Sequence, residues 1–152
     1  MAVGRQALGP EAVVRICRRD EIPVVLALWS AADTVPTPSD DAASLRRLLD
    51  SSADALLIAE VGGRMVGTLI AAWDGWRGNL YRLAVLPAYR RRGIARELVR
   101  EGERRLADKG TVRVSALVYA EHEPAVGLWL AVGYHRDVRV GRFAKSLVAR
   151  GS

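Results

Sequence analysis

The chain has 152 residues, a length that suits one domain with a sizeable hydrophobic core. Half of its residues are hydrophobic and 26% are charged, as in ordinary globular proteins. No apolar run reaches the ~18 residues that a membrane-spanning helix needs, and the single cysteine, Cys17, cannot form a disulfide within the chain. Because the N-terminus also lacks the apolar core of a secretory signal, we expect a cytoplasmic protein with no membrane partner.

The formal net charge is +6, and half of this excess comes from Arg90, Arg91 and Arg92 in one short segment. Such a concentration favours a polyanionic ligand at that segment. Binding of nucleic acid is the competing explanation, but the sequence shows no basic stripe interleaved with aromatic residues and no known nucleic-acid motif. We therefore expect no nucleic-acid partner. The two histidines and the cysteine form no metal-binding pattern, so no metal is expected either.

The first half of the chain contains four strand patterns and two helix patterns. Residues 1–12 read as a loose leader, and Asp20 is a good N-cap for a helix that runs to about Ala32. Prolines at 36 and 38 impose a loop, after which Ser39 or Asp40 is expected to cap a second helix. Strands are expected over residues 13–18, 55–61, 64–73 and 79–85, with Gly62-Gly63 as a hairpin turn.

The second half opens with the clearest helix pattern of the chain. Ile94, Leu98, Gly102 and Leu106 recur at four-residue spacing, and Gly110 is a signal for the C-terminal end of the helix. A fifth strand is expected over residues 112–119, a fourth helix from Pro124 to Gly133, and a closing pair of strands over 134–140 and 142–148. Since no linker or repeat interrupts the chain, residues 1–152 are expected to form a single domain.

The turn between the strand at 79–85 and the following helix has the features of a phosphate site. A helix N-terminus presents backbone N–H groups without intrahelical partners and carries partial positive charge. Gly93 allows the backbone to approach a ligand closely, Ala95 keeps the next turn thin, and the three arginines of 90–92 add permanent charge. The turn therefore predicts a pyrophosphate cradle; the alternative is an ordinary connection whose arginines are solvated.

Two motifs resemble a known family. Leu83-Ala84-Val85-Leu86-Pro87 followed by Arg90-x-x-Gly93-x-Ala95 resembles the acyl-CoA signature of the GNAT acyltransferases, and residues 125–134 resemble the second motif of that family. The resemblance covers roughly residues 13–147. It implies the GNAT fold of the α/β class, a mixed sheet with the order β-αα-βββ-α-β-α-ββ, in which the fourth and fifth strands are parallel and splay apart.

The resemblance also implies acetyl-CoA as the cofactor. Its pantetheine arm would pair with the backbone around Leu83 and Val85, its thioester would point at the gap between Val85 and Tyr119, and a backbone N–H at a bulge near Val85 would polarise the thioester carbonyl. The residues expected to bind the cofactor are Leu83, Ala84, Val85, Arg90, Arg91, Arg92, Gly93, Ile94, Ala95, Arg96 and Trp129.

The catalytic residues are less clear, because the second motif departs from the family pattern. Trp129 replaces the tyrosine that usually acts as general acid, and an indole cannot transfer a proton at neutral pH. His122 replaces the usual asparagine; a histidine can carry a proton near neutral pH, so His122 and Tyr119 are the candidate catalytic residues. Equally, His122 could be a hydrogen-bonding spacer for the cofactor. Glu121 and Glu123 are alternative bases, more simply interpreted as carboxylates favoured at a helix N-terminus.

The predicted function is acetyl transfer from acetyl-CoA to a primary amine of a small molecule or protein. Direct attack of the amine is expected, since the sequence shows no nucleophilic Cys or Ser arrangement. Two alternatives stay open: a catalytically degenerate acyl-CoA-binding sensor on the same fold, and a basic nucleic-acid-binding module. The sequence identifies neither the acceptor nor the acyl-chain preference. A homodimer is possible, because small proteins of the family often dimerise.

Overall fold

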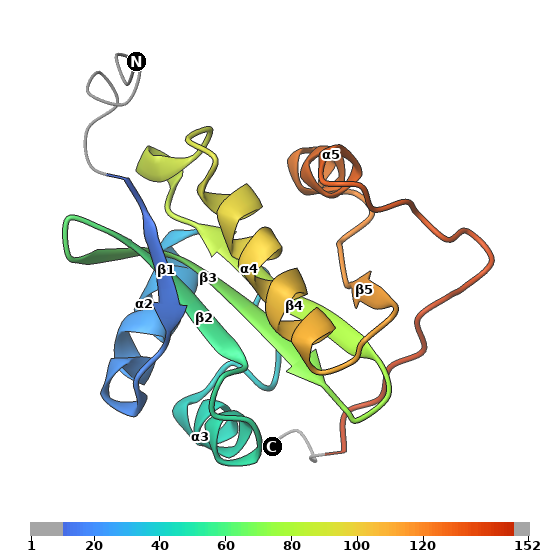
Figure 1. Ribbon diagram of the computed structural model, residues 1–152, viewed down its shortest axis with the longest axis horizontal. Helices are drawn as coiled ribbons and strands as arrows, with labels where there is room; N and C mark the ends of the chain where they lie inside the picture. Colours follow the sequence, from blue (N-terminus) through green and yellow to red (C-terminus); the bar gives the residue numbers. More distant parts are fainter. Residues whose placement is uncertain (1–10, 148–152) are drawn as a thin grey trace, which may run out of the picture. The chain divides into compact units, whose positions relative to one another are not determined.

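The computed structural model describes residues 11–147 (Figure 1). The chain divides between Leu117 and Val118 into two compact units. The first unit holds the sheet and three α-helices, and the second holds the helix α5, Glu123–Ala131. Most of the expected leader, residues 1–10, and the last residue of the expected closing strands lie outside the described part. That the whole chain is one domain stays a prediction.

The first unit is built on a five-stranded mixed sheet with the strand order β1-β2-β3-β4-β5. Neighbouring strands are antiparallel except β4 and β5, which are parallel as predicted. The mixed α/β fold class is therefore confirmed. The five strands are β1 (Val13–Ile16), β2 (Leu56–Val61), β3 (Arg64–Trp73), β4 (Gly78–Val85) and β5 (Val114–Ala116).

The turn between β2 and β3 shows how closely local sequence fixes this sheet. Val61 pairs with Arg64, and between them Gly62 and Gly63 have φ angles of +57° and +80°. A two-residue hairpin turn of this type requires positive φ at both central residues, which glycine adopts without steric cost. The β2–β3 hairpin predicted at these two glycines is confirmed.

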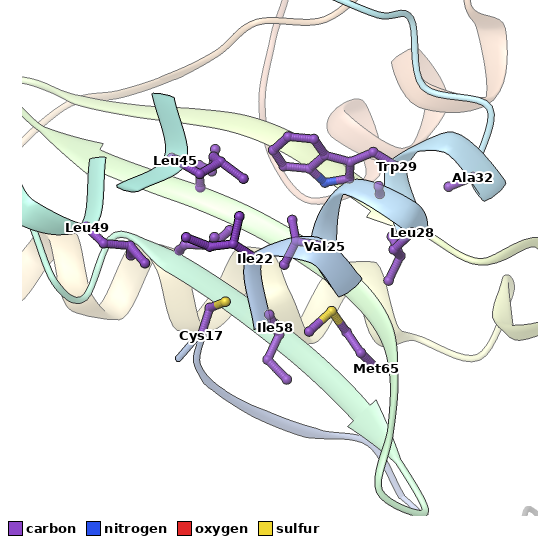
Figure 2. Packing of buried hydrophobic residues seen from close by; sticks show 13 residues of the cluster. Cys17, Ile22, Val25, Leu28, Trp29, Ala32, Leu45, Leu49, Ile58 and Met65 are labelled. Atoms are coloured by element: carbon purple, nitrogen blue, oxygen red, sulfur yellow. The ribbon is translucent and has the colours of Figure 1, made fainter. Parts of the chain in front are cut away.

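Helices cover both faces of the sheet. On one face, α2 (Ile22–Ala31) and α3 (Ala42–Ser51) pack with β2 and β3 in a hydrophobic cluster that includes Val25, Trp29 and Ile58 (Figure 2). On the other, α4 (Ile94–Asp108) crosses β3 and β4 (Figure 1). α4 approaches the sheet closely because it carries Gly102 at the contact, where a Cβ would lie 2.9 Å from Leu69. The apolar face predicted for this helix is the buried one.

Two predicted helix caps are wrong. Asp20 does not cap α2; it lies in a short 3₁₀ turn, Arg19–Glu21, and the Glu21 carboxylate accepts from the Arg18 N–H at 2.9 Å. For α3, Asp41 is the N-cap and accepts from the Ser44 N–H at 2.7 Å. Asp40 instead forms an ion pair with Arg82 of β4. Arg82 is distant in sequence, so local capping rules do not detect this pair.

The C-terminal strands also differ from the prediction. β5 has three residues rather than the eight of 112–119, and Val112 at its expected start is 97% exposed. The described residues 134–147 form no strand, and the apolar side chains after Tyr134, such as Phe143 at 99%, are exposed. A strand is stabilised by a hydrogen-bonded neighbour and a buried face, and the alternating pattern of this segment finds neither within the described part. In the second unit, α5 forms with Pro124 in its first turn as expected.

Among residues 11–147, no helix combines the length and the apolar character that crossing a bilayer requires.

Candidate functional site

The edge of β4 is only partly occupied by its parallel neighbour. β5 pairs with Gly78, Asn79 and Leu80, and the last hydrogen bond between them runs from the Leu117 N–H to the Leu80 carbonyl at 3.4 Å. Beyond Leu80, residues 81–85 have no strand beside them on that edge within the described part of the chain. Backbone N–H and C=O groups left in this way require partners, so the edge can accept an extended ligand as an added strand.

A β-bulge interrupts the pairing of β4 with β3 within the same residues, 81–85. Thr68 pairs with Ala84 and Ile70 with Tyr81, so two residues, Arg82 and Leu83, lie opposite one residue of β3. Bulges often lie next to active sites, where they redirect backbone groups. We expected a bulge near Val85, and it lies at Arg82 and Leu83 instead. No glycine marks this place in the local sequence, although a glycine with positive φ is typical of one common type of bulge.

After β4 the chain passes through a short 3₁₀ turn, Pro87–Tyr89, into the turn that precedes α4. Gly93 is the N-cap of α4 with a φ of +81°, and no side chain caps this helix end within the described residues. The first intrahelical bond runs from the Glu97 N–H to the Gly93 carbonyl at 3.0 Å. The N–H groups of Ile94, Ala95 and Arg96 therefore precede the helical ladder, which is the geometry of an anion site.

Positive charge surrounds this helix end. Arg91, Arg92 and Arg96 are exposed around the turn. Arg92 lies over the ring of Tyr89 at 5.0 Å from its centroid, and Arg64, at the start of β3, approaches the same ring at 5.8 Å. These contacts hold two guanidinium groups beside the N-terminus of α4, so the hairpin end of β3 and the end of β4 lie together, as the topology predicts.

Arg90 has a different role from its neighbours. Its Nε donates to the Val85 carbonyl at 3.1 Å, and its Nη2 donates to the Ala32 carbonyl at 3.0 Å. The side chain therefore joins the end of β4 to the end of α2 and holds the turn in place. The direct pyrophosphate contact expected of Arg90 stays a prediction, and its observed partners are two backbone carbonyls that sequence motifs do not specify.

Cys17 is not an activated nucleophile. Cys17 is 3% exposed, and burial raises the pKa of its thiol to about 11, so it is largely protonated at neutral pH. No group of three or more His, Cys, Asp or Glu side chains that could hold a metal ion occurs in the part of the chain that is described.

The second unit carries the candidate catalytic residues. His122 is the N-cap of α5: its Nδ1 accepts from the Ala125 N–H at 3.1 Å, which leaves Nε2 to carry the proton of the neutral ring. The His122 N–H donates to the Tyr119 carbonyl at 3.0 Å, so one turn joins the two residues, and the Tyr119 side chain is 53% exposed. Trp129 is 7% exposed and contacts Tyr134 edge-on, with 4.9 Å between ring centroids.

The structure thus brings Leu83, Ala84 and Val85 together with residues 90–96 at one end of the first unit. Tyr119, His122 and Trp129 belong to the second unit. Trp129 packs as a core residue there, and its expected contact with the cofactor stays a prediction, as do the catalytic roles of His122 and Tyr119.

Comparisons with known proteins agree with this geometry. The model of the acetyltransferase (GNAT) family matches residues 23–134. An acetyltransferase of Pectobacterium atrosepticum is 32% identical over 121 residues, covering 80% of this chain and 86% of the relative. One from Sodalis glossinidius is 30% identical over 135 residues, covering 89% and 95%.

Among solved structures, an aminoglycoside N-acetyltransferase in complex with CoA superposes with a TM-score of 0.71 at 22% identity, over 90% of this chain and 96% of that one. This likeness shows a shared fold. Together with the family match and the two curated relatives, it leads to one conclusion: the chain belongs to the GNAT family of acetyltransferases.

Proposed function

We propose that this member of the family uses acetyl-CoA and transfers the acetyl group to a primary amine by direct attack. The observation that carries the proposal is the N-terminus of α4, which has no side-chain cap and lies at the same end of the first unit as the open edge of β4. A diphosphate and an extended amide chain need these two features side by side. The aminoglycoside N-acetyltransferase that shares the fold is in complex with CoA, which supports an acyl-CoA as the cosubstrate.

The residues present fit that ligand. A Cβ at Gly93 would meet nothing within 4 Å, so the space over the helix N-terminus is open to a phosphate. The N–H groups of residues 94–96 would bind the pyrophosphate, with Arg91, Arg92 and Arg96 adding charge. The edge of β4 around Leu83 and Val85 would hold the pantetheine amides, and the bulge would aim a backbone N–H at the carbonyl oxygen. When bound, acetyl-CoA supplies the activated acyl group.

A carboxylate base for proton transfer must come from outside β4. That strand carries no carboxylate, and its one cation, Arg82, is held in an ion pair with Asp40. His122 is our candidate for the group that moves the proton, through Nε2, because Nδ1 is engaged with α5. The acceptor is a primary amine of a small molecule or a protein, and the site of action is the cytoplasm. Membership of an acetyltransferase family favours this enzyme over a non-catalytic sensor.

The proposal is tested at Gly93. Gly93→Glu would place a carboxylate and added bulk where the pyrophosphate should lie, so we expect no measurable binding of acetyl-CoA by calorimetry and an unchanged circular dichroism spectrum. Gly93→Ala is the matched control. It carries the same backbone strain, roughly 1–2 kcal/mol, without the charge, and should keep most of the affinity. Equal affinity of Gly93→Glu and wild type would refute the phosphate site.

Catalysis is tested separately, by release of free CoA from acetyl-CoA in the presence of primary amines of different classes. Release that depends on the amine, and is lost in Gly93→Glu, supports the enzyme. Tight binding of acetyl-CoA with no release in the presence of any amine would favour the sensor instead.

A further inference from the structure

Arg82 lies at the bulge of β4 in a conformation that residues other than glycine rarely adopt. Its φ is +55°, in the left-handed region. Strain of this kind persists only where surrounding contacts hold it, and it is concentrated at functional sites. Here the Arg82 carbonyl accepts from Thr68 Oγ1 at 2.9 Å, and that hydroxyl in turn accepts from Trp29 Nε1 at 2.8 Å. Thr68 and Trp29 are both buried, so the bulge is held from inside the first unit.

The side chain of the same residue reaches the proline loop, residues 33–40. The guanidinium donates through Nε to Asp40 Oδ1, through Nη1 to the Val35 carbonyl and through Nη2 to Thr37 Oγ1, each at 3.0 Å. Nη2 also pairs with the second carboxylate oxygen of Asp40. The Arg82 and Asp40 side chains are only 14% and 17% exposed. The guanidinium also lies 5.2 Å from the ring centroid of Trp29.

Arg82 therefore connects two parts of the molecule that are distant in sequence. Its backbone is fixed by Trp29 and Thr68, and its planar guanidinium fixes the loop at three donor positions, a geometry that lysine cannot reproduce. A displaced proline loop would lose its hydrogen bonds to the residue that forms the bulge. We infer that Arg82 is a positioning residue, which clamps residues 33–40 to the bulge of β4 and thereby sets the backbone donor that meets the thioester. The inference rests on the proposed function, because it assigns the bulge to the acyl end of acetyl-CoA.

Two ligands separate this role from an ordinary stabilising ion pair. Acetyl-CoA reaches the bulge with its thioester, whereas desulfo-CoA lacks the sulfur and acyl group but keeps the pyrophosphate. We expect Arg82→Ala and Asp40→Asn to weaken calorimetric binding of acetyl-CoA by about three- to tenfold, the equivalent of one lost hydrogen bond. Binding of desulfo-CoA should change by less than about twofold. Arg82→Lys keeps the charge without the fork and should resemble Arg82→Ala.

Arg15 provides the control. It forms a comparable partly buried pair, with Nη2 2.7 Å from Glu21 Oε2 and Nε 3.0 Å from Glu60 Oε1, but it lies on β1 at the opposite edge of the sheet. Arg15→Ala should lower Tm and leave both affinities unchanged. Because Asp40→Asn and Arg82→Lys are mild changes, the test survives a failure of Arg82→Ala to fold.

Two results would overturn the inference alone: the same fractional loss for both ligands in the Arg82 and Asp40 variants, or unchanged binding of acetyl-CoA in variants whose Tm has fallen. Wild-type protein that binds neither compound would overturn the proposed function, and the inference with it.

Discussion

The side chain of His122 caps the N-terminus of α5. The residue can therefore contribute both to the stability of this helix and to proton transfer. Nδ1 satisfies the Ala125 N–H, one of the groups that a helix N-terminus leaves without an intrahelical partner. Nε2 is directed away from that bond and can carry a proton. Asparagine is also a good N-cap but cannot transfer protons at neutral pH, so one substitution separates the two contributions.

If His122 moves the proton in acetyl transfer, His122→Asn and His122→Ala should both lower kcat by roughly 10²–10⁴, the usual worth of a general acid or base. Only His122→Ala should also destabilise α5, by about 0.5–2 kcal/mol, because it removes the cap. Steady-state kinetics and urea unfolding measure the two effects. Turnover near the wild-type value in His122→Asn would show that the ring only positions groups, as the asparagine of related motifs would.

At this scale the sequence predicts some site residues and misses others. The place of Gly93 follows from local rules, since the turn needs positive φ and the helix end needs an open N-terminus. Arg82 and Arg90 are different. Arg82 meets Asp40, and Arg90 meets the Ala32 carbonyl 58 residues away. Contacts over such separations depend on the tertiary fold. The acyl-CoA signature includes Arg90 but does not specify its carbonyl partners, and no motif in the sequence includes Arg82.

Some helices and strands are also predicted correctly from the sequence, and others are not. Strands over 56–61, 64–73 and 78–85 and the helix 94–108 agree with the prediction within one or two residues, because glycine turns and a clear apolar face mark their limits. The strands expected over 134–148 fail. Their alternation gives β-propensity, but propensity is expressed only where a neighbouring strand and a buried face are present, and the described residues of that segment have neither.

Two glycines within helices, one tightly packed and one not, test how much packing limits the side chain that each helix can carry. At Gly102 in α4 a Cβ would lie 2.9 Å from Leu69 Cδ2 and 3.4 Å from the Ala71 Cβ, whereas at Gly127 in α5 it would meet nothing within 4 Å. Replacing glycine by alanine favours a helix by about 1 kcal/mol, and overpacking a core costs about 1–3 kcal/mol.

Gly102→Ala should therefore lower the free energy of unfolding by about 1 kcal/mol, the net of these opposing effects. Gly127→Ala should raise it by about 0.5–1 kcal/mol, because only the propensity gain applies. Urea unfolding followed by far-ultraviolet circular dichroism compares the two variants. A gain of equal size at both positions would show that the Leu69 side chain moves aside and that α4 is not held at its present distance from the sheet.

For the molecule as a whole, the thiol of Cys17 can report on the opening of the core, because it lies buried in the core of the first unit. Cys17 is the one cysteine of the chain and lies among Ile22, Val25 and Ile58 in the cluster between the sheet and α2 (Figure 2). Its thiol is buried, donates to the Arg18 carbonyl at 3.2 Å, and has a pKa raised to about 11 by burial. Alkylation needs an exposed thiolate, so reaction with iodoacetamide at pH ~7.5 should require this core to open.

A ligand that binds only the folded state should lower the rate of Cys17 alkylation without contacting the thiol, because it makes opening of the core less frequent. A ligand at 100 times its Kd stabilises the folded state by RT ln(1 + [L]/Kd), about 2.7 kcal/mol. Acetyl-CoA at that concentration should therefore slow alkylation of Cys17 by about 100-fold in the wild type, and not at all in Gly93→Glu. Mass spectrometry of the alkylated chain follows the reaction. If acetyl-CoA binds by calorimetry but labelling is not slowed, Cys17 must be reached by a local opening of the segment around β1 that leaves the α4 site intact. The core and the site would then be energetically separate, and the contacts that join α2 to β4 through Arg90 would not bind them into one cooperative unit.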